Sequence, residues 1–284
     1  MKIKVKLKSE NGCQNLMKGE SMFFEYEYYE LVEKVFYKSK VKYGRNGKVY
    51  SLFAQTITFD VSKYFPILTR RKIFYKGVLG EFAAFIRKPK SVKDFEKWGC
   101  NYWKLWGDKD GKLELDYGNA WLDWNGVNQI EWLINEIKTN PDSRRLLLSG
   151  FRPDRVIKNE LSLPCCHYMY QFYVNNGKLD LLWIQRSADV MLGIPSNAIL
   201  ATVLLTSMAN TVGNLKYGSV TMLFGDTHIY DEHMQVVDEF LNNTKQYTPP
   251  TYVNKCKNIL EFKPDDIELS NYKYDKVLKF ELKA

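Results

Sequence analysis

The feature that most constrains the fold is a long segment, residues 196–212, whose side chains are apolar on nearly every side. A helix that is apolar all round has no face for water, so other elements of the chain must enclose it. The chain has 284 residues, enough for one large domain or two small ones with a sizeable core. The segment therefore predicts a buried helix inside a globular fold.

The spacing of apolar residues predicts further elements around this helix. Helices are expected at residues 20–38, 72–87, 126–139 (ending at Asn140–Pro141) and near 230–242. Strands are expected at 2–7, 49–61, 145–151, 167–175, 179–187 and 217–225, with more near the C-terminus. With no repeat or linker in the sequence, the prediction is an α+β fold: a single domain over residues 1–284, with a mixed β-sheet packed by helices.

Charge and cysteine content narrow the class of protein. The net charge is +8, but basic and acidic residues are interspersed, so the charge alone does not select nucleic acid as a partner. The five cysteines form no CxxC pair and have no zinc-like spacing with histidine: Cys13, Cys100, Cys165, Cys166 and Cys256. The N-terminal segment lacks a signal-type apolar run, and no stretch reaches the apolar length of a membrane span. The expectation is a reduced cytoplasmic protein without a metal site.

The candidate chemistry centres on Cys166, which His167 follows directly. Arginine-bearing segments stand on both sides of it, at 142–145 and 185–187. Guanidinium groups bind phosphate oxygens in pairs, and a nearby arginine also favours the nucleophilic thiolate. These residues predict a cysteine nucleophile beside a phosphate monoester. The alternatives are a buried structural cysteine and ordinary surface ion pairs.

The same segments carry a resemblance to a known family. PDSRR at 141–145, CHYMYQFYV at 166–174, QRSADVMLGIPSN at 185–197 and GDTHIY at 225–230 resemble thymidylate synthases and pyrimidine nucleotide hydroxymethylases. Weaker similarity runs from about Tyr50 to the end, and residues 1–40 form an N-terminal extension of unknown role. The resemblance implies a folate-dependent enzyme that transfers one carbon from 5,10-methylenetetrahydrofolate to C5 of deoxyuridylate (dUMP). It also implies a thymidylate synthase-like fold and a homodimer.

The family's functional positions fall into three groups in this sequence. Those implied in catalysis are Cys166, Glu81, Tyr117, His167 and Asn197. Those implied in nucleotide binding are Arg45, Arg144, Arg145, Gln185, Arg186, Ser187, Asn197, His228 and Tyr230. Those implied in folate binding are Trp103, Trp106, Asp189, Leu192 and Gly193, and no metal is implied.

Each role below is what the resemblance implies. Cys166 adds to C6 of the pyrimidine, and C5 then attacks the folate-borne carbon. Glu81 organises proton transfer through water, and Tyr117 helps to remove the C5 proton. Arg144 and Arg145 reach the phosphate of the partner subunit's nucleotide.

The remaining nucleotide contacts are implied in the same way. Arg186 and Ser187 hold the phosphate, and His228 and Tyr230 bind the sugar hydroxyl. Asn197 selects the base, because a carboxamide can donate to O4 and accept from N3–H of uracil. The deoxycytidylate hydroxymethylases carry aspartate there, so asparagine indicates dUMP.

Several positions depart from the synthase pattern. Ser196 replaces an aromatic residue that packs on folate, Ala120 replaces a glutamine, and Arg152-Pro153 replaces part of a Trp-Asn segment. The C-terminal FELKA lacks the small apolar tail that seals a synthase, and Arg45 is displaced by one residue from the family's phosphate-loop arginine. A site that admits water would hydrate the C5 methylene instead of reducing it.

The departures favour a phage-type dUMP hydroxymethylase, located in the host cytoplasm if phage-encoded, that produces 5-hydroxymethyl-dUMP. The alternative is a divergent thymidylate synthase, which Trp103 and Leu163 favour because they resemble shielding residues of the synthases. A remote alternative is a nucleic-acid-binding protein on an old enzyme fold. The set of Cys166, Arg186, Asn197 and His228 argues against it, since RNA binding needs no nucleophile.

Overall fold

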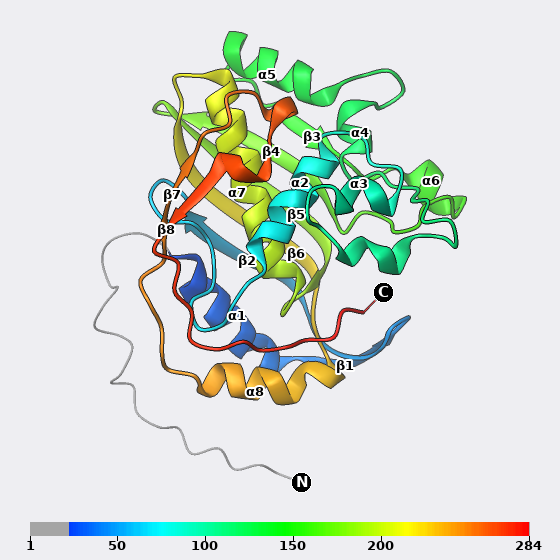
Figure 1. Cartoon of the computed structure of the whole chain (residues 1–284), viewed down its shortest axis with the longest axis vertical. Helices are drawn as coiled ribbons and strands as arrows, with labels where there is room; N and C mark the ends of the chain where they lie inside the picture. The colour runs from blue at the N-terminus through cyan, green and yellow to red at the C-terminus, as the bar shows by residue number, and fades with distance from the viewer. Residues whose placement is uncertain (1–22, 284) are drawn as a thin grey trace.

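The computed structural model describes residues 23–283 of the chain (Figure 1). The strand expected at 2–7 lies outside the described residues, as does most of the extension at 1–40. The helices are α1 (Phe24–Lys38), α2 (Tyr75–Phe85), α3 (Val92–Glu96), α4 (Asn119–Leu122), α5 (Gln129–Thr139), α6 (Pro153–Ile157), α7 (Gly193–Val212) and α8 (Met234–Asn242). The 3-10 turns near the site are η1 (Tyr102–Trp106) and η2 (Asp231–His233), and η3 (Ile259–Glu261) and η4 (Pro264–Asp266) follow later.

A six-stranded mixed sheet is the scaffold of the single domain. Its strands are β1 (Lys40–Gly44), β2 (Gly47–Asp60), β3 (Leu147–Ser149), β4 (His167–Asn175), β5 (Lys178–Asp189) and β6 (Lys216–Tyr230), in the order β1-β2-β6-β5-β4-β3. Neighbours pair antiparallel except β5 and β6, which pair in parallel. Two further strands, β7 (Thr251–Asn254) and β8 (Ile267–Ser270), form a separate antiparallel pair.

The predicted buried helix is α7, which crosses over from β5 to β6. Most of its length is buried, and its polar members are satisfied within the helix: Thr202 donates to the carbonyl of Ala198 at 2.9 Å and Thr206 to that of Thr202 at 2.8 Å. Figure 1 shows α2 and α7 in front of the sheet and α1 beside α8 at one end of the molecule. Because helices cover this face, the core lies between them and the sheet.

The predicted elements agree with the structure in kind and order. The strands at 49–61, 167–175, 179–187 and 217–225 correspond to β2, β4, β5 and β6, and 145–151 contains the shorter β3. The helices at 20–38, 72–87, 126–139 and 196–212 correspond to α1, α2, α5 and α7. The helix expected near 230–242 corresponds to α8, but it begins later, at Met234, because β6 continues to Tyr230 and η2 intervenes. This extension matters, because the added residues of β6 line the site.

Candidate active site

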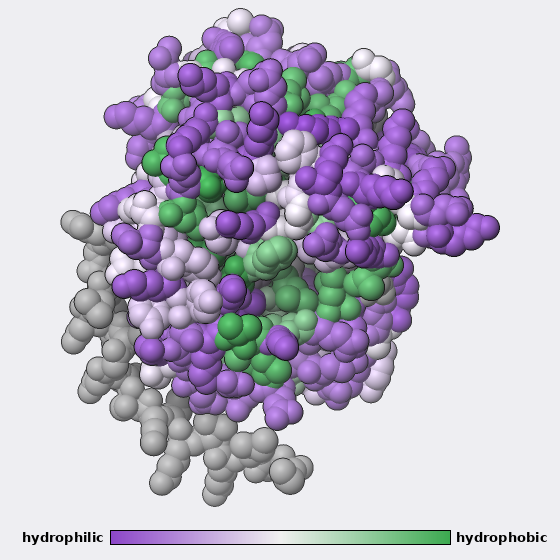
Figure 2. Space-filling view, in the orientation of Figure 1, coloured by the Kyte–Doolittle hydropathy of each residue, from purple (hydrophilic) through white to green (hydrophobic). Residues whose placement is uncertain are grey.

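One cavity of about 990 Å³ lies where β5 and β6 end, beside the start of α7. Its other walls come from α2, η1, the β1–β2 turn and residues 278–283 of the C-terminal segment. Figure 2 shows the molecule hollowed near the centre of this face, with apolar side chains around the hollow. The predicted site residues that line the cavity are Arg45, Glu81, Trp103, Trp106, Tyr117, Cys166, His167, Gln185, Arg186, Ser187, Asp189, Leu192, Gly193, Asn197, His228 and Tyr230. Arg144 and Arg145 lie outside it, exposed before β3.

Cys166 stands directly before β4 and is partly buried. The hydroxyl of Tyr117 accepts a hydrogen bond from the backbone N–H of Cys166 at 2.5 Å. Arg186 holds the other side of this loop, because its guanidinium donates to the carbonyls of Cys165 at 2.8 Å and Pro164 at 2.9 Å. The arginine predicted to bind phosphate thus also fixes the backbone of the predicted nucleophile.

Asn197 is oriented by a chain of hydrogen bonds. Gln185 donates its amide N–H to the carbonyl of Ser187 at 2.8 Å, and its amide oxygen accepts from the indole of Trp183 at 3.3 Å. That oxygen also accepts from Nδ2 of Asn197 at 2.9 Å. Since a carbonyl only accepts and an indole N–H only donates, Gln185 has one orientation, and it fixes which end of Asn197 is the amine. The carbonyl oxygen of Asn197 and its second N–H remain for a base with an acceptor beside a donor.

His228 and Tyr230 lie at the end of β6 with their rings 5.1 Å apart. Nδ1 of His228 is 3.2 Å from Asp226, which also accepts from Ser51 at 2.8 Å. Lys42 completes the group around Asp226, and the hydrogen bond from His228 is the first cause that holds the pKa of Asp226 well below its ordinary value. With Nδ1 occupied, Nε2 of His228 is the atom available for a ligand.

Glu81 is buried in α2 at the back of the cavity. Burial raises its pKa from 4.5 to about 7, and the hydroxyl of Tyr102 and the indole N–H of Trp103 partly oppose that rise. The indole N–H donates to Oε1 at 2.7 Å. A carboxyl group with a pKa near neutrality can both give and take a proton under ordinary conditions. Trp103 is only 3% exposed and stacks on Phe95 with ring centroids 4.7 Å apart, so packing fixes the indole that donates to Glu81.

His167 points into the core at the cavity wall. Burial lowers its pKa to about 3, and Nδ1 lies 2.5 Å from the hydroxyl of Tyr170. The imidazole is therefore neutral near pH 7 and cannot serve as a cationic acid. Its position fits a supporting role for Cys166 and Tyr117, whose ring lies 4.8 Å away.

The wall predicted for folate is built by the start of α7 and by η1. Oδ1 of Asp189 accepts from the backbone N–H groups of Met191 at 2.8 Å and Leu192 at 3.2 Å, which leaves Oδ2 for a ligand. The indole N–H of Trp106 is buried without a partner among residues 23–283. A carboxylate acceptor and an unsatisfied donor in one wall fit a flat heterocycle that carries both kinds of polar atom.

Two of the sequence departures lie away from this wall. Ala120 is buried in α4, which packs against α5. Arg152 precedes α6 and Pro153 begins it. None of these three residues lines the cavity. Ser196 does line it, and its hydroxyl donates to the carbonyl of Leu192 at 2.9 Å. The displaced Arg45 lies on the β1–β2 turn and also reaches the cavity.

The C-terminal segment supplies more apolar surface than expected from FELKA. Leu278, Phe280 and Leu282 all line the cavity. His233, which does not line the cavity, holds this segment, because its Nε2 lies 2.8 Å from the carbonyl oxygen of Glu281. The expectation of a tail without sealing side chains is therefore too strong.

Sequence reasoning missed several cavity residues. The most notable is Arg71, which is 3% exposed, donates to the carbonyl of Met191 and lies 5.0 Å from the ring of Phe280. Lys42 and Asp226 were also missed as site residues, although Asp226 lies in the GDTHIY segment. The position of Asp226 inside this segment, two residues before His228, was the only available signal.

The described residues hold no group of three or more His, Cys, Asp or Glu side chains arranged for a metal ion. In the same part of the chain, no helix has the length and apolar character to cross a membrane.

A comparison with protein families gives an independent result. The family model described as thymidylate synthase matches residues 26–284, which is most of the chain and includes every residue of the cavity. The chain therefore belongs to the thymidylate synthase family, whose members transfer a one-carbon unit from methylenetetrahydrofolate to C5 of dUMP.

Proposed function

We propose that this enzyme is a dUMP hydroxymethylase, which converts dUMP, methylenetetrahydrofolate and water into 5-hydroxymethyl-dUMP and tetrahydrofolate. The observation that carries the proposal is Ser196, a small side chain in the cavity wall directly before Asn197. An aromatic ring at this place would occupy the wall beside the predicted site of the base. The serine leaves that volume open to water, which can then reach the reactive methylene on C5.

In this proposal, different residues of the cavity bind the phosphate, the sugar and the base of the nucleotide. Arg45, Arg186 and Ser187 bind the phosphate, while His228 and Tyr230 bind the sugar. Asn197, held by Gln185, recognises the uracil edge. These contacts place C6 over the thiol of Cys166, and proximity of this kind contributes strongly to rate.

Proton movement falls to two buried groups. Tyr117 accepts from the backbone of Cys166 and lies next to the nucleophile. Because burial raises the pKa of Tyr117 well above 10, it is a phenol, which takes the proton of C5 only as it passes its own proton to water in the cavity. Glu81, with its pKa near 7, exchanges that proton on the other side. Bound folate supplies the one-carbon unit; Asp189 and Trp106 orient its ring, with Leu192 and Gly193 beside them.

The proposal includes a homodimer with Arg144 and Arg145 acting across the interface. A sheet face with an accessible apolar side chain supports this part of the proposal: Leu223 on β6 is 38% exposed. Leu223 is adjacent to Ile184 on β5, and Ile184 to Met169 on β4, so an apolar row crosses three strands. Such a row is suited to a second copy of the same face, which would bury it symmetrically.

Thymidylate synthesis is the second candidate, and a specific observation favours it. Phe280 and Leu282 of the C-terminal segment line the cavity and can exclude water from it. Exclusion of water would leave hydride transfer from folate as the only route from the methylene, giving thymidylate and dihydrofolate.

Mass spectrometry of the nucleotide product decides between the two. Purified enzyme with dUMP and methylenetetrahydrofolate should give 5-hydroxymethyl-dUMP with no rise in dihydrofolate absorbance. A dihydrofolate rise that equals the dUMP consumed would make the enzyme a synthase. Cys166→Ser should abolish either product while dUMP still binds, because a serine hydroxyl is far less ionised than a thiol. Cys165→Ser is the matched control and should retain turnover, since Cys165 does not line the cavity.

A further inference from the structure

The loop between β3 and β4 delivers Cys166 to the cavity. Its ends are packed, with Phe151 against Tyr168 and Cys165 in the core, but its middle is not. Its helix α6 contains no buried residue, and Ile157 is 83% exposed. A five-residue helix without apolar contacts is not held by packing. Polar contacts must therefore fix the middle of this loop against the domain.

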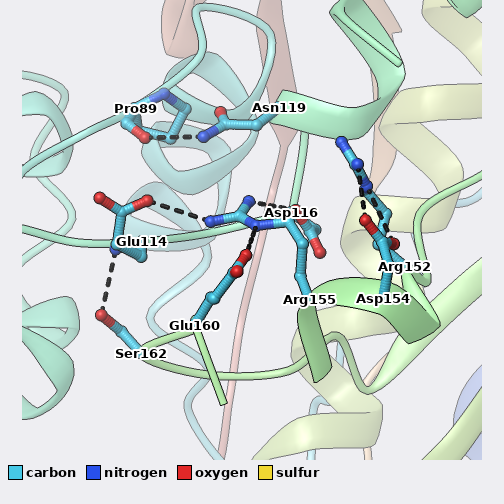
Figure 3. Close-up of polar contacts among 9 residues, drawn as sticks. All are labelled: Pro89, Glu114, Asp116, Asn119, Arg152, Asp154, Arg155, Glu160 and Ser162. Carbon is cyan, nitrogen blue, oxygen red and sulfur yellow. Dashed lines mark hydrogen bonds and ion pairs between the residues drawn. The ribbon is translucent and has the colours of Figure 1, made fainter. Parts of the chain in front are cut away.

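Arg155 supplies the principal contact. From α6 its guanidinium reaches Oδ1 of Asp116 at 2.6 Å and Oε2 of Glu114 at 3.0 Å, and its Nε lies 3.5 Å from Glu160 within the same loop (Figure 3). Figure 3 also shows that the neighbouring Arg152 pairs separately with Asp154. Arg155 thus joins the loop to the segment directly before Tyr117, because each of its two terminal nitrogens contacts a different carboxylate.

A second contact fastens the same two segments nearer to the nucleophile. The backbone N–H of Ser162 donates to the carbonyl of Glu114 at 2.9 Å, and the N–H of Glu114 donates to the hydroxyl of Ser162 at 3.1 Å. Four residues later the chain reaches Cys166, whose N–H meets the Tyr117 hydroxyl. The loop from Arg155 to Cys166 and the segment from Glu114 to Tyr117 are therefore joined at both ends. Together they form a closed ring of contacts that includes the nucleophile.

Asp116 is the member of this ring that most depends on Arg155. Its side chain is 2% exposed, and Oδ2 is buried without a hydrogen-bond partner in the described chain. Burial raises the pKa of Asp116, and Arg155 is the leading influence that opposes the rise. A buried carboxylate that loses its guanidinium partner either takes up a proton or draws its segment toward water.

The consequence reaches Tyr117 because it is the next residue. Its ring is already held by Phe85, which stacks on it with centroids 5.4 Å apart. The position of the hydroxyl therefore depends on the backbone conformation at Tyr117. We propose that Arg155 is a positioning residue, which through Asp116 and Glu114 fixes the Tyr117 hydroxyl against the backbone of Cys166. Arg155 does not line the cavity and acts only through these groups. The inference rests on the proposed role of Cys166 as the nucleophile.

The test uses Arg155→Lys and Arg155→Met, with Lys112→Met as the matched control. Lys112 is an exposed cation that pairs with the same Glu114 at 2.8 Å but has no contact with Asp116. Lysine at position 155 cannot bridge two carboxylates as a planar fork does. Both Arg155 variants should lower kcat by about tenfold or more, with KM for dUMP changed by less than about threefold. The control should keep both constants.

A further variant separates positioning from simple loss of stability. Adding Asp116→Asn to Arg155→Met removes the unpaired buried charge, so the thermal midpoint lost in the single variant should recover. The value of kcat should stay low, because the ion pair that sets Tyr117 is still absent. Recovery of kcat together with the thermal midpoint would overturn the proposal, as would an unchanged kcat in both folded single variants.

Alkylation by iodoacetamide, followed at the Cys166 peptide by mass spectrometry, needs no turnover. The released loop should expose Cys166, so alkylation in Arg155→Met should be at least about threefold faster than in wild type and in Lys112→Met. If wild type alkylates as expected but makes no C5-modified nucleotide, the proposed function fails while the loop assignment stands. If Arg155→Met alkylates at the wild-type rate, the loop is fixed without Arg155 and the inference fails by itself.

Discussion

Replacement of Trp103 by phenylalanine removes one donor from Glu81 and should move a pH limb by a calculable amount. The indole N–H is the 2.7 Å donor to Oε1, and it stabilises the charged form of the carboxyl group. A hydrogen bond to a charged group contributes about 1.5–3 kcal/mol, and one pKa unit corresponds to about 1.4 kcal/mol. Loss of the donor favours the protonated form, so the pKa of Glu81 should rise from about 7 by roughly one to two units. The phenyl ring keeps the stack on Phe95, so the wall should persist.

The assay is the pH profile of kcat at saturating dUMP and folate. The limb assigned to Glu81 should lie near pH 7 in wild type and near pH 8–9 in Trp103→Phe, whichever protonation state is active. Trp106→Phe is the matched control: its indole N–H has no partner in the described residues, so the limb should stay in place. A limb that does not move in an active Trp103→Phe enzyme, or that moves equally in both variants, would refute the assignment of Glu81.

Three further outcomes follow from the geometry. Asn197→Asp places a carboxylate against the amide oxygen of Gln185, so specificity constants should shift from dUMP toward deoxycytidylate by about 1–3 kcal/mol in steady-state kinetics with both nucleotides; an unchanged ratio would remove Asn197 from base selection. His167 has a folded-state pKa near 3, below the unfolded value, so its contribution to stability is complete above about pH 6.5 and is lost as pH falls. Urea titrations from about pH 6.5 to 5 should show about 2 kcal/mol of loss that is missing in His167→Gln, and equal slopes would contradict the neutral imidazole. Gly118→Ala should lower the free energy of unfolding by more than about 2 kcal/mol in the same titrations, because φ is +70° and the added Cβ would lie 2.1 Å from the carbonyl oxygen of Phe85; wild-type stability would show that the turn can relax.

The sequence predicted the interior of this fold better than its edges. Strand β4 matches the expected residues 167–175 because one of its faces is buried and imposes a period of two. Strand β1 was missed, since all five of its residues are exposed and carry no such pattern. The helix near 230 was placed too early because β6 keeps strand geometry to Tyr230 in pairing with β2, a contact with residues some 180 positions away.

The site shows the same division. Local motifs identified Cys166, Arg186, Asn197 and His228, and the fold brings them to one cavity. The partners that orient them are remote in sequence: Trp103 on Glu81 is one case, and Arg155 on Asp116 is another. Local spacing carries no information about such pairs, because they depend on how separate loops pack. The roles assigned to individual residues stay predictions until the variants above are measured.

The parallel pairing of β5 with β6 has a kinetic consequence. The strands β4 and β5 are joined by a short turn and can pair early, whereas β6 joins β5 only after the 20-residue helix α7 has crossed over. Ser187 lies opposite Asp226, and Asp189 opposite His228, so residues of the cavity lie on both strands of this parallel pair. Long-range pairings are slow steps of folding. Refolding chains should therefore regain most of their far-ultraviolet circular dichroism before they regain activity, and a cell that makes this enzyme carries for a time a population that is largely structured but still has no site.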